Sequence, residues 1–329
     1  MVTPGSSTAA PRSYAILGTG ALGGYYGACL QRGGLTVHFL LRSDYHHVRD
    51  RGLTVKSVAG DFSLPQVHAY SRVEEMPPVD VVVIALKTTQ NHCLQTLLPP
   101  LLKPDTIILL LQNGLDIEAE VAAIAPQHVL LSGLCFICSN KVGPGAIHHL
   151  DYGSVLLGAY HRDNLPGGIT AEMDAIAADF KAADIAIDLA EDLYLARWRK
   201  LVWNIPFNGL SVVLNATTTE MMESDAARSL AAALMAEVVQ AANACGDRVA
   251  SGENRHLPPD LIENMLEHTA QMKPYRTSMK IDHDEGRPLE IKAIFDNPIK
   301  AAQQAGVAVP RIEMLAQQLR FLDQRRKLA

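Results

Sequence analysis

Apolar and polar positions follow different patterns in the two halves of the chain. In the first half, short runs rich in β-branched residues alternate with stretches whose apolar residues recur at helical spacing. The runs predict buried strands at residues 14–17, 37–41, 79–86, 106–111 and 129–138, and the stretches predict helices at 21–32, 89–98 and 117–124. This alternation is typical of a doubly wound parallel sheet with helices on both faces, so we expect a Rossmann-type α/β unit.

The strand-like runs disappear from about residue 191. Long segments rich in Ala, Leu, Met and Glu replace them, for example at 224–245 and 259–272. A more polar stretch with Gly and Pro, residues 142–166, predicts hairpins that close the first unit. We therefore expect a disordered tail at 1–11, a dinucleotide-binding domain at 12–190 and an all-helical substrate domain at 191–329, with the active site in the cleft between the two domains.

The first predicted strand runs into a glycine-rich turn that opens a helix of small residues. In dinucleotide-binding folds the first glycine permits the tight turn, the second lets the backbone approach a pyrophosphate, and the third lets helix and strand pack closely. The alternative is a strand–turn–helix without a ligand. The position of the turn favours a pyrophosphate at the helix N-terminus. The cofactor-binding residues predicted here are Gly18, Thr19, Gly20, Ala21, Leu22 and Gly23.

The end of the second strand carries the residue that distinguishes NADP from NAD. NAD-binding domains usually place Asp or Glu there, to bond the ribose 2′-hydroxyl. This chain has Arg42, about 20 residues past the last glycine, where an arginine suits a 2′-phosphate. Asp44 would favour NAD if it turned inward, and Arg42 would then be only a surface cation. Arg42 favours NADP(H).

Two further strand ends point into the same cleft, because ligands in open parallel sheets bind outside the carboxyl ends of the strands. Lys87 follows one of these strands and can meet a phosphate or a substrate carboxylate. Asn113 follows the other and can bond the nicotinamide ribose or the substrate. Both can instead be solvated loop residues.

Three polar residues in the helical half share one face of a predicted helix. Lys200, Asn204 and Asn208 are spaced four residues apart among Leu, Val, Trp and Phe. Polar groups on an apolar face are costly unless they have partners. Pro206 would kink such a helix. When a hydride reaches a carbonyl carbon, the oxygen needs a proton, which a protonated lysine can donate while it stabilises the developing charge.

On these residues the chain resembles the ketopantoate reductases over nearly its whole length. The resemblance implies that Lys200 is the proton donor and that Asn204 and Asn208 bind substrate. It matches Ser278 to a serine that binds the substrate carboxylate, and Glu290 to a catalytic glutamate near the nicotinamide and the lysine. It also places Lys87 and Asn113 at cofactor- or substrate-contacting positions.

The chain departs from the family pattern around the substrate. Ile281 stands in place of a glutamine, Thr218 in place of an asparagine, and Lys292 begins a segment that replaces the usual Asp-Tyr-Ile-Asn-Gly. The strand that normally brings small polar residues to the cofactor leaves Ser139 for that role. The exact keto acid is therefore open.

Composition excludes several classes of protein. A formal net charge of -6 argues against a nucleic-acid binder. The apolar runs are too short to span a bilayer, and the first residues have no secretory pattern. Five cysteines, an odd number, indicate reduced thiols in a soluble cytoplasmic protein. Cys135 and Cys138 have redox-motif spacing but lie in an apolar strand, and no metal site is predicted.

We therefore predict an NADPH-dependent reductase of a small anionic 2-keto acid, with 2-dehydropantoate as the favoured substrate. A reductase of a different keto or imino substrate is one alternative, and a catalytically silent NADP-binding sensor is another. A sensor needs no proton donor, so Lys200 and Glu290 argue against it. A homodimer is compatible with the sequence.

Overall fold

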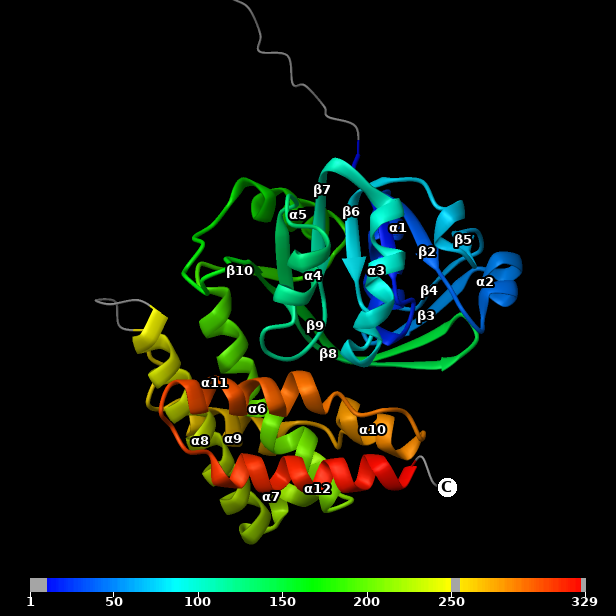
Figure 1. The fold of residues 1–329 in the computed structure, drawn as a ribbon. Helices are drawn as coiled ribbons and strands as arrows, with labels where there is room; N and C mark the ends of the chain where they lie inside the picture. The colour runs from blue at the N-terminus through cyan, green and yellow to red at the C-terminus, as the bar shows by residue number, and fades with distance from the viewer. Residues whose placement is uncertain (1–10, 250–254, 327–329) are drawn as a thin grey trace, which may run out of the picture.

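A computed structural model describes residues 11–249 and 255–326 of the chain. These residues form a sheet with flanking helices and, beneath it in Figure 1, a unit built of helices alone. The predicted α/β class with a helical C-terminal part is confirmed. Apart from residue 11, the tail predicted at 1–11 lies outside the described residues. None of the described helices has the length and apolarity of a membrane span.

The strands of the described part form one ten-stranded sheet. They are β1 (Ser13–Leu17), β2 (Thr36–Leu40), β3 (Leu53–Ser57), β4 (Phe62–Leu64), β5 (His68–Tyr70), β6 (Val79–Ile84), β7 (Leu102–Leu110), β8 (Leu130–Gly143), β9 (Ala146–Ala159) and β10 (Ile187–Ala190). Their order is β4-β3-β9-β8-β7-β6-β1-β2-β5, with β10 beside β9. The sheet is mostly parallel, because only the pairs β8–β9 and β3–β4 are antiparallel.

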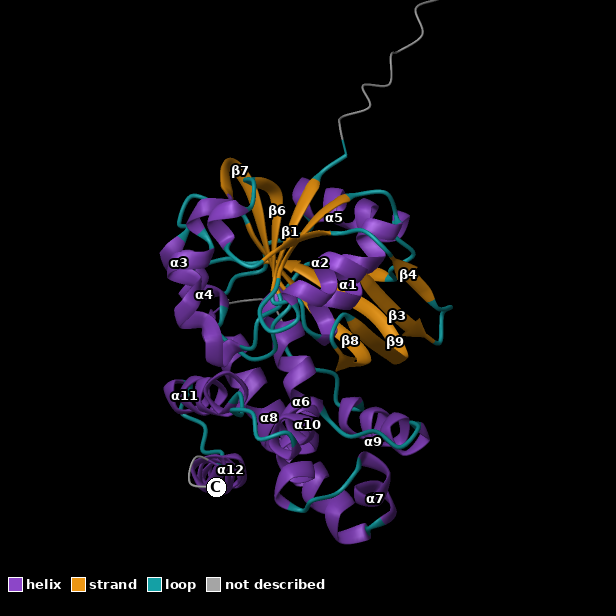
Figure 2. Cartoon of the chain, turned by 90° about the vertical axis from the view of Figure 1, so that its right-hand side faces the viewer, coloured by secondary structure: helices purple, strands orange, loops and turns teal. Residues whose placement is uncertain are grey.

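Strand β1 shows why both faces of the sheet are buried. Its side chains point alternately to opposite faces. Tyr14 and Ile16 join an apolar cluster with α1 (Ala21–Arg32) and α5 (Ala171–Ala182). Ala15 and Leu17 join a second cluster with α3 (Leu94–Leu97) and α4 (Glu118–Ile124). Figure 2 shows these helices in two layers with the sheet between them. Smaller elements of this unit are α2 (Tyr45–Arg51), η1 (Val73–Glu75), η2 (Thr88–Cys93) and η3 (Pro99–Leu101).

The helical unit is built around α6 (Leu193–Val213), which runs from the sheet into the helices below (Figure 1). The Asp192 side chain caps it by accepting a hydrogen bond from Leu195 N at 2.9 Å. Packing is close: a Cβ on Gly209 would lie 2.6 Å from Leu315 Cδ2. Around α6 lie α7 (Thr218–Glu223), α8 (Asp225–Val249), α9 (Leu261–Gln271), α10 (Ser278–Asp284), the π-helix η4 (Lys292–Asp296), α11 (Asn297–Gln304) and α12 (Pro310–Arg326).

Several predicted elements match the structure and some differ. The helix predicted at 21–32 is confirmed as α1, and α6 continues through Pro206. The single helix predicted at 89–98 is wrong: the segment divides into the 3₁₀-helix η2 and the short α3, and Pro99 then begins a second 3₁₀-helix, η3. The polar stretch at 142–166 contributes a long strand, β9, to the sheet. The short strands β3, β4, β5 and β10 were not predicted.

Candidate functional site

The glycine loop, residues 18–23, joins β1 to α1 at the carboxyl edge of the sheet. Gly18 has a φ of +101°, and a Cβ there would lie 2.6 Å from Leu86 N. A Cβ on Gly23 would lie 2.3 Å from Gly18 O. At Gly20, by contrast, a Cβ would meet no atom within 4 Å. The backbone at Gly20 therefore faces the open space that a pyrophosphate needs, so the loop fits a dinucleotide.

Two hydroxyl groups connect this loop to its neighbours in the sheet. Thr19 Oγ1 donates to Leu40 O at 2.9 Å, which ties the loop to β2. Ser139 Oγ donates to Ala21 O at 3.4 Å, which ties the start of α1 to β8. Ser139 is therefore beside the glycine loop.

The cation and the carboxylate after β2 lie in different environments. Arg42 is exposed and has no ion-pair partner in residues 11–249 or 255–326. Asp44 is 6% exposed, and its Oδ2 lies 2.6 Å from Lys141 Nζ. The same oxygen accepts a hydrogen bond from Gly145 N at 3.2 Å. Asp44 is thus bonded to the β8–β9 hairpin, while Arg42 is available to an anion.

Lys200 extends from α6 toward β8, where the helical unit meets the sheet. Its Nζ donates to Cys135 O at 2.7 Å and lies 5.3 Å from the centre of the Phe136 ring. Burial lowers the pKa of the Lys200 ammonium to about 8, and the nearby positive charge of Arg197 lowers it further. An ammonium with a pKa of this value can give up its proton near neutral pH.

The two amides predicted beside Lys200 lie on the same helix and are buried. Asn204 is 6% exposed, and its side chain has no hydrogen bond to any described residue. Asn208 Oδ1 accepts a hydrogen bond from Met279 N at 3.4 Å. Met279 follows Ser278, the first residue of α10, whose hydroxyl is partly exposed. The structure therefore places Asn208 against the start of α10, where Ser278 lies, and it leaves the Asn204 amide without a hydrogen-bond partner among the described residues.

Lys87 lies between two buried carboxylates of the helical unit. Its Nζ is 2.6 Å from Asp282 Oδ2 and 3.3 Å from Glu290 Oε2. Glu290 Oε1 also accepts hydrogen bonds from Thr88 N at 2.8 Å and from Thr88 Oγ1 at 2.9 Å. Burial acts to lower the pKa of Lys87, but attraction to Glu290 and Asp282 outweighs it and raises the pKa. Glu290 acts on Lys200 only through its charge, which raises the pKa of that ammonium.

Asn113 lies on a loop that is anchored to the π-helix η4. Gly114 has a φ of +114°, and a Cβ there would lie 2.5 Å from the Ala293 Cβ. Leu115 N donates to Ala293 O at 2.9 Å, and Asn297 Nδ2 donates to Leu115 O at 2.6 Å. The Asn113 side chain is partly exposed and has no hydrogen bond to the described residues. The loop is therefore fixed, and its amide is available.

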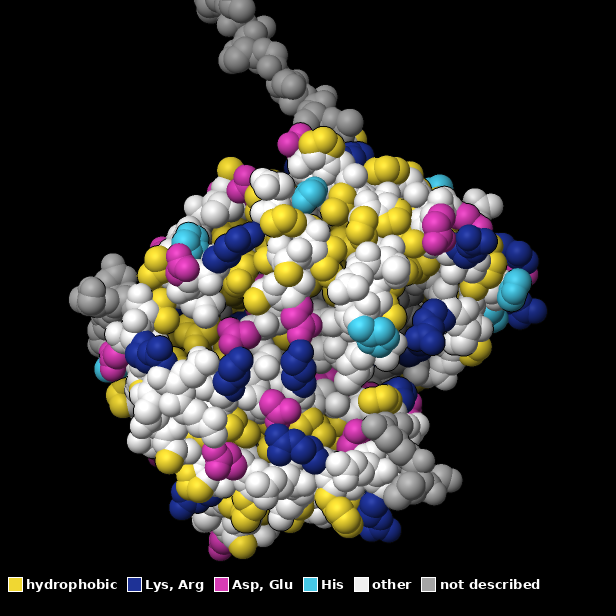
Figure 3. All heavy atoms as spheres, viewed as in Figure 1, with side chains coloured by type: hydrophobic (Ala, Val, Ile, Leu, Met, Phe, Trp, Pro, Cys, Tyr) yellow, Lys and Arg dark blue, Asp and Glu magenta, His cyan; other side chains and the backbone are white. Residues whose placement is uncertain are grey.

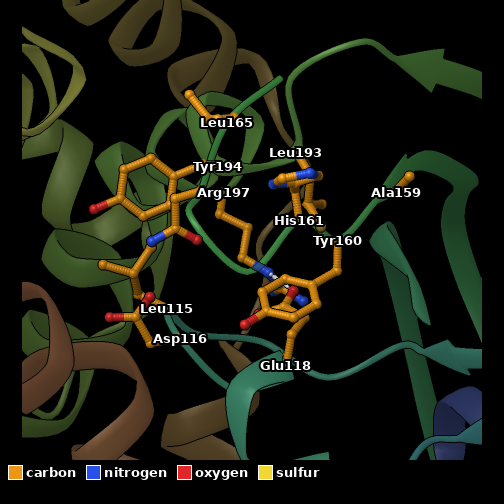
Figure 4. Close-up of a pocket in the computed structure, with 11 residues that line it drawn as sticks. Leu115, Asp116, Glu118, Ala159, Tyr160, His161, Leu165, Leu193, Tyr194 and Arg197 are labelled. Carbon is orange, nitrogen blue, oxygen red and sulfur yellow. Dashed lines mark hydrogen bonds and ion pairs between the residues drawn. The ribbon is translucent and has the colours of Figure 1, made fainter. Parts of the chain in front are cut away.

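Arg197 is a buried residue of this junction that the sequence-based analysis missed. Its guanidinium lies 2.5 Å from Glu118 Oε1 and donates to Ser132 Oγ at 2.9 Å and to the backbone oxygens of Gln112 and Gly114. Figure 4 shows this side chain reaching from α6 toward Glu118 in a small pocket. A signal was present, since Arg197 precedes Lys200 by three residues and lies on the same helical face.

Surface charges also bridge the two units. Figure 3 shows basic and acidic side chains next to one another across the middle of the molecule, at the level where the sheet unit meets the helices. One such pair joins Lys292 of η4 to Glu120 of α4. This pair and the buried contacts of Arg197 both join the helical unit to the sheet unit.

The three residues that depart from the family pattern each contact other parts of the structure. Thr218 is fully buried and donates from Oγ1 to Tyr275 O at 3.4 Å. Ile281 is buried within α10, and Lys292 forms its ion pair with Glu120. In the structure these three side chains are therefore engaged in packing or in contacts between the units.

Both parts of the chain match families of known proteins. Residues 14–162 match the family described as "Ketopantoate reductase PanE/ApbA", and residues 192–323 match its C-terminal counterpart. The chain is 57% identical over 316 residues to a 2-dehydropantoate 2-reductase from Nostoc, with 96% of this chain and 97% of that protein covered.

Solved structures share the fold. The crystal structure of 2-dehydropantoate 2-reductase from Geobacter metallireducens is 44% identical, covers 94% of this chain and 99% of its own, and superposes with a TM-score of 0.87. A D-mandelate dehydrogenase solved with NADH and anilino(oxo)acetate is 20% identical, with 96% and 99% coverage and a TM-score of 0.83. The latter likeness shows the fold alone.

Proposed function

This chain belongs to the ketopantoate reductase family, and from that premise we propose that it reduces 2-dehydropantoate to pantoate with NADPH, using Lys200 as the proton donor. The observation that carries the proposal is the position of Lys200. Its ammonium is directed at β8 from the helical unit, and burial brings its pKa to about 8.

The residues of the chain would hold the cofactor along one edge of the sheet. Residues 18–23 would bind the pyrophosphate, because Gly20 leaves room for it at the start of α1. Arg42 would pair with the 2′-phosphate, and Ser139 and Asn113 would contact the dinucleotide further along the edge. Lys87 and Glu290 would bound the site from the side of the helical unit. The chemistry that NADPH supplies when bound is a hydride for the keto carbon.

The substrate would lie against the helical unit. The free amide of Asn204 can hydrogen-bond the keto acid, and Asn208 and Ser278 would add polar groups near the start of α10. As negative charge grows on the keto oxygen, the Lys200 ammonium stabilises it and transfers a proton from Nζ, giving the hydroxyl group. Because Lys200 is partly exposed, solvent can return the proton for the next turnover.

Replacing Lys200 by alanine tests the proposal directly. With 2-dehydropantoate, the turnover of Lys200→Ala is expected to fall by about 100-fold or more, the scale of losing a general acid. NADPH binding, measured by fluorescence titration, is expected to stay near that of the wild type. Arg199→Ala is the matched control, because Arg199 is the exposed neighbour on the same helix. Unchanged turnover in Lys200→Ala, or no activity of the wild type on 2-dehydropantoate, would overturn the proposal.

A further inference from the structure

Lys141 connects the β8–β9 hairpin to the glycine loop. Its Nζ lies 3.4 Å from Thr19 O, at the second residue of that loop, and 2.6 Å from Asp44 Oδ2. The Lys141 side chain is 31% exposed. A lysine ammonium has three N–H donors, so one donor remains after these two contacts and can reach a ligand at the same edge.

The contacts of Asp44 are with the β8–β9 hairpin, and they compete with the hydrogen bond that NAD recognition would require. For NAD recognition, a carboxylate after the second strand must accept a hydrogen bond from the ribose 2′-hydroxyl. The Asp44 carboxylate instead accepts from Gly145 N, and it pairs with Lys141. Both contacts come from the hairpin and engage Asp44 Oδ2, and the side chain is buried, so the carboxylate is held on the hairpin side.

The charges at this corner favour an added phosphate. Two cationic side chains, Arg42 and Lys141, face one carboxylate, Asp44, at this corner. A monoester phosphate carries about −1.5 to −2 at neutral pH, more than Arg42 alone neutralises. Lys141 is the second cation within reach of the glycine loop, through its contact with Thr19 O.

We propose that Lys141 is a specificity-determining residue of this enzyme: with Arg42 it binds the 2′-phosphate of NADPH, and by its ion pair it keeps Asp44 from receiving the 2′-hydroxyl of NADH. This inference rests on the proposed function, which places a dinucleotide on the glycine loop. It adds a residue from the hairpin, far from Arg42 in the sequence, to the recognition of the phosphate.

Two nucleotides that differ only by the phosphate provide the test. Adenosine 2′,5′-bisphosphate and 5′-AMP are titrated into the full-length protein by calorimetry. Lys141→Met is expected to weaken binding of the bisphosphate about 10-fold, the scale of losing one charge-assisted hydrogen bond, and not to weaken binding of 5′-AMP. Lys103→Met is the matched control, because Lys103 also pairs with an aspartate, Asp80, at 2.7 Å but lies on β7. Lys141→Arg is expected to restore binding of the bisphosphate.

A second variant separates specificity from structure. Asp44→Asn removes the charge that competes for Lys141. It is therefore expected to bind the bisphosphate more tightly and to bind NADH no more weakly than the wild type does. Equal losses of affinity for the two nucleotides in Lys141→Met would overturn the inference, since Lys141 would then be only structural. A selective loss of affinity for NADH in Asp44→Asn would also overturn it, since Asp44 would then bind the ribose. If Lys141→Met unfolds, which thermal melting shows, Lys141→Gln replaces it with the same expected outcomes.

Failure of this inference is distinguishable from failure of the proposed function. The nucleotide titrations involve neither the nicotinamide nor the keto acid, so they report on the adenosine end alone. If the wild type discriminates between the two nucleotides and Lys141→Met loses affinity for both equally, only the role of Lys141 is refuted. A wild-type protein that binds NADPH but does not oxidise it with 2-dehydropantoate refutes the proposed function only.

Discussion

The pKa of Lys200 sets the pH dependence expected of the reaction. Burial is the main cause that lowers this pKa to about 8. As proton donor, Lys200 must be protonated, so the rate of reduction falls as the pH rises through the pKa. With a pKa of about 8, roughly 0.9 of the molecules carry the proton at about pH 7 and roughly 0.1 at about pH 9. The rate of reduction is therefore expected to fall about 10-fold between these two pH values.

The appropriate measurement is kcat/KM for 2-dehydropantoate, followed by the loss of NADPH absorbance across this range. At saturating NADPH this ratio reports the pKa values of the enzyme before it binds the keto acid. The reverse reaction needs the neutral amine, so its kcat/KM should rise through the same midpoint. Opposite slopes in the two directions would identify a group that moves the transferred proton.

Lys200→Arg is the control for this profile. An arginine keeps the positive charge, but it does not titrate in this range. The variant should be slow, and its residual rate should lack the step near pH 8. A wild-type profile that stays flat to about pH 10, or a step that persists in Lys200→Arg, would show that Lys200 is not the proton donor.

Further predictions concern the loop, the junction and the second carboxylate. Gly20→Ala should leave the melting temperature unchanged but weaken NADPH binding about 10-fold or more, because its Cβ enters open space that the cofactor needs. Gly23→Ala should lower the melting temperature and also weaken NADPH binding, since its Cβ would lie 2.3 Å from a backbone oxygen. Arg197→Met leaves the Glu118 carboxylate buried and unpaired, so urea unfolding should show a loss of about 3–5 kcal/mol, and the double variant with Glu118→Gln a smaller loss. Glu290→Gln removes a charge that raises the pKa of the proton donor, so the falling limb of the pH profile should move to lower pH.

The fold was predictable where hydrophobic periodicity is strong. The helix after the glycine loop was predicted with its observed bounds, and the change to helices near residue 190 lies close to the start of α6 at Leu193. The strands β4 and β5 have only three residues each, too few for periodicity to register. β4 pairs with its neighbour β3, whereas the place of β5 in the sheet depends on pairing with β2, a strand distant in the sequence.

The candidate site likewise contains residues that local sequence rules predict and contacts that depend on the tertiary structure. Lys200, Asn204 and Asn208 follow from helical spacing, and Lys87 and Asn113 follow from strand ends, because local rules place these side chains. The ion pair of Lys141 with Asp44 joins residues 97 positions apart, and a local sequence pattern does not predict a contact at that separation. It exists because the β8–β9 hairpin returns to the end of β2, and only the tertiary structure shows that return.

Two lysines lie at this junction, and their surroundings push their pKa values in opposite directions. Asp282 and Glu290 raise the pKa of Lys87, so it stays charged at every pH at which the enzyme works. Lys200 has no carboxylate within ion-pair distance among the described residues, and burial lowers its pKa to about 8. A proton donor works best when its pKa is near the working pH, whereas a permanent cation suits the binding of an anion. The carboxylates that α10 and its following segment direct at Lys87 therefore keep this lysine charged, which supports the proposal that Lys200, and not Lys87, transfers the proton.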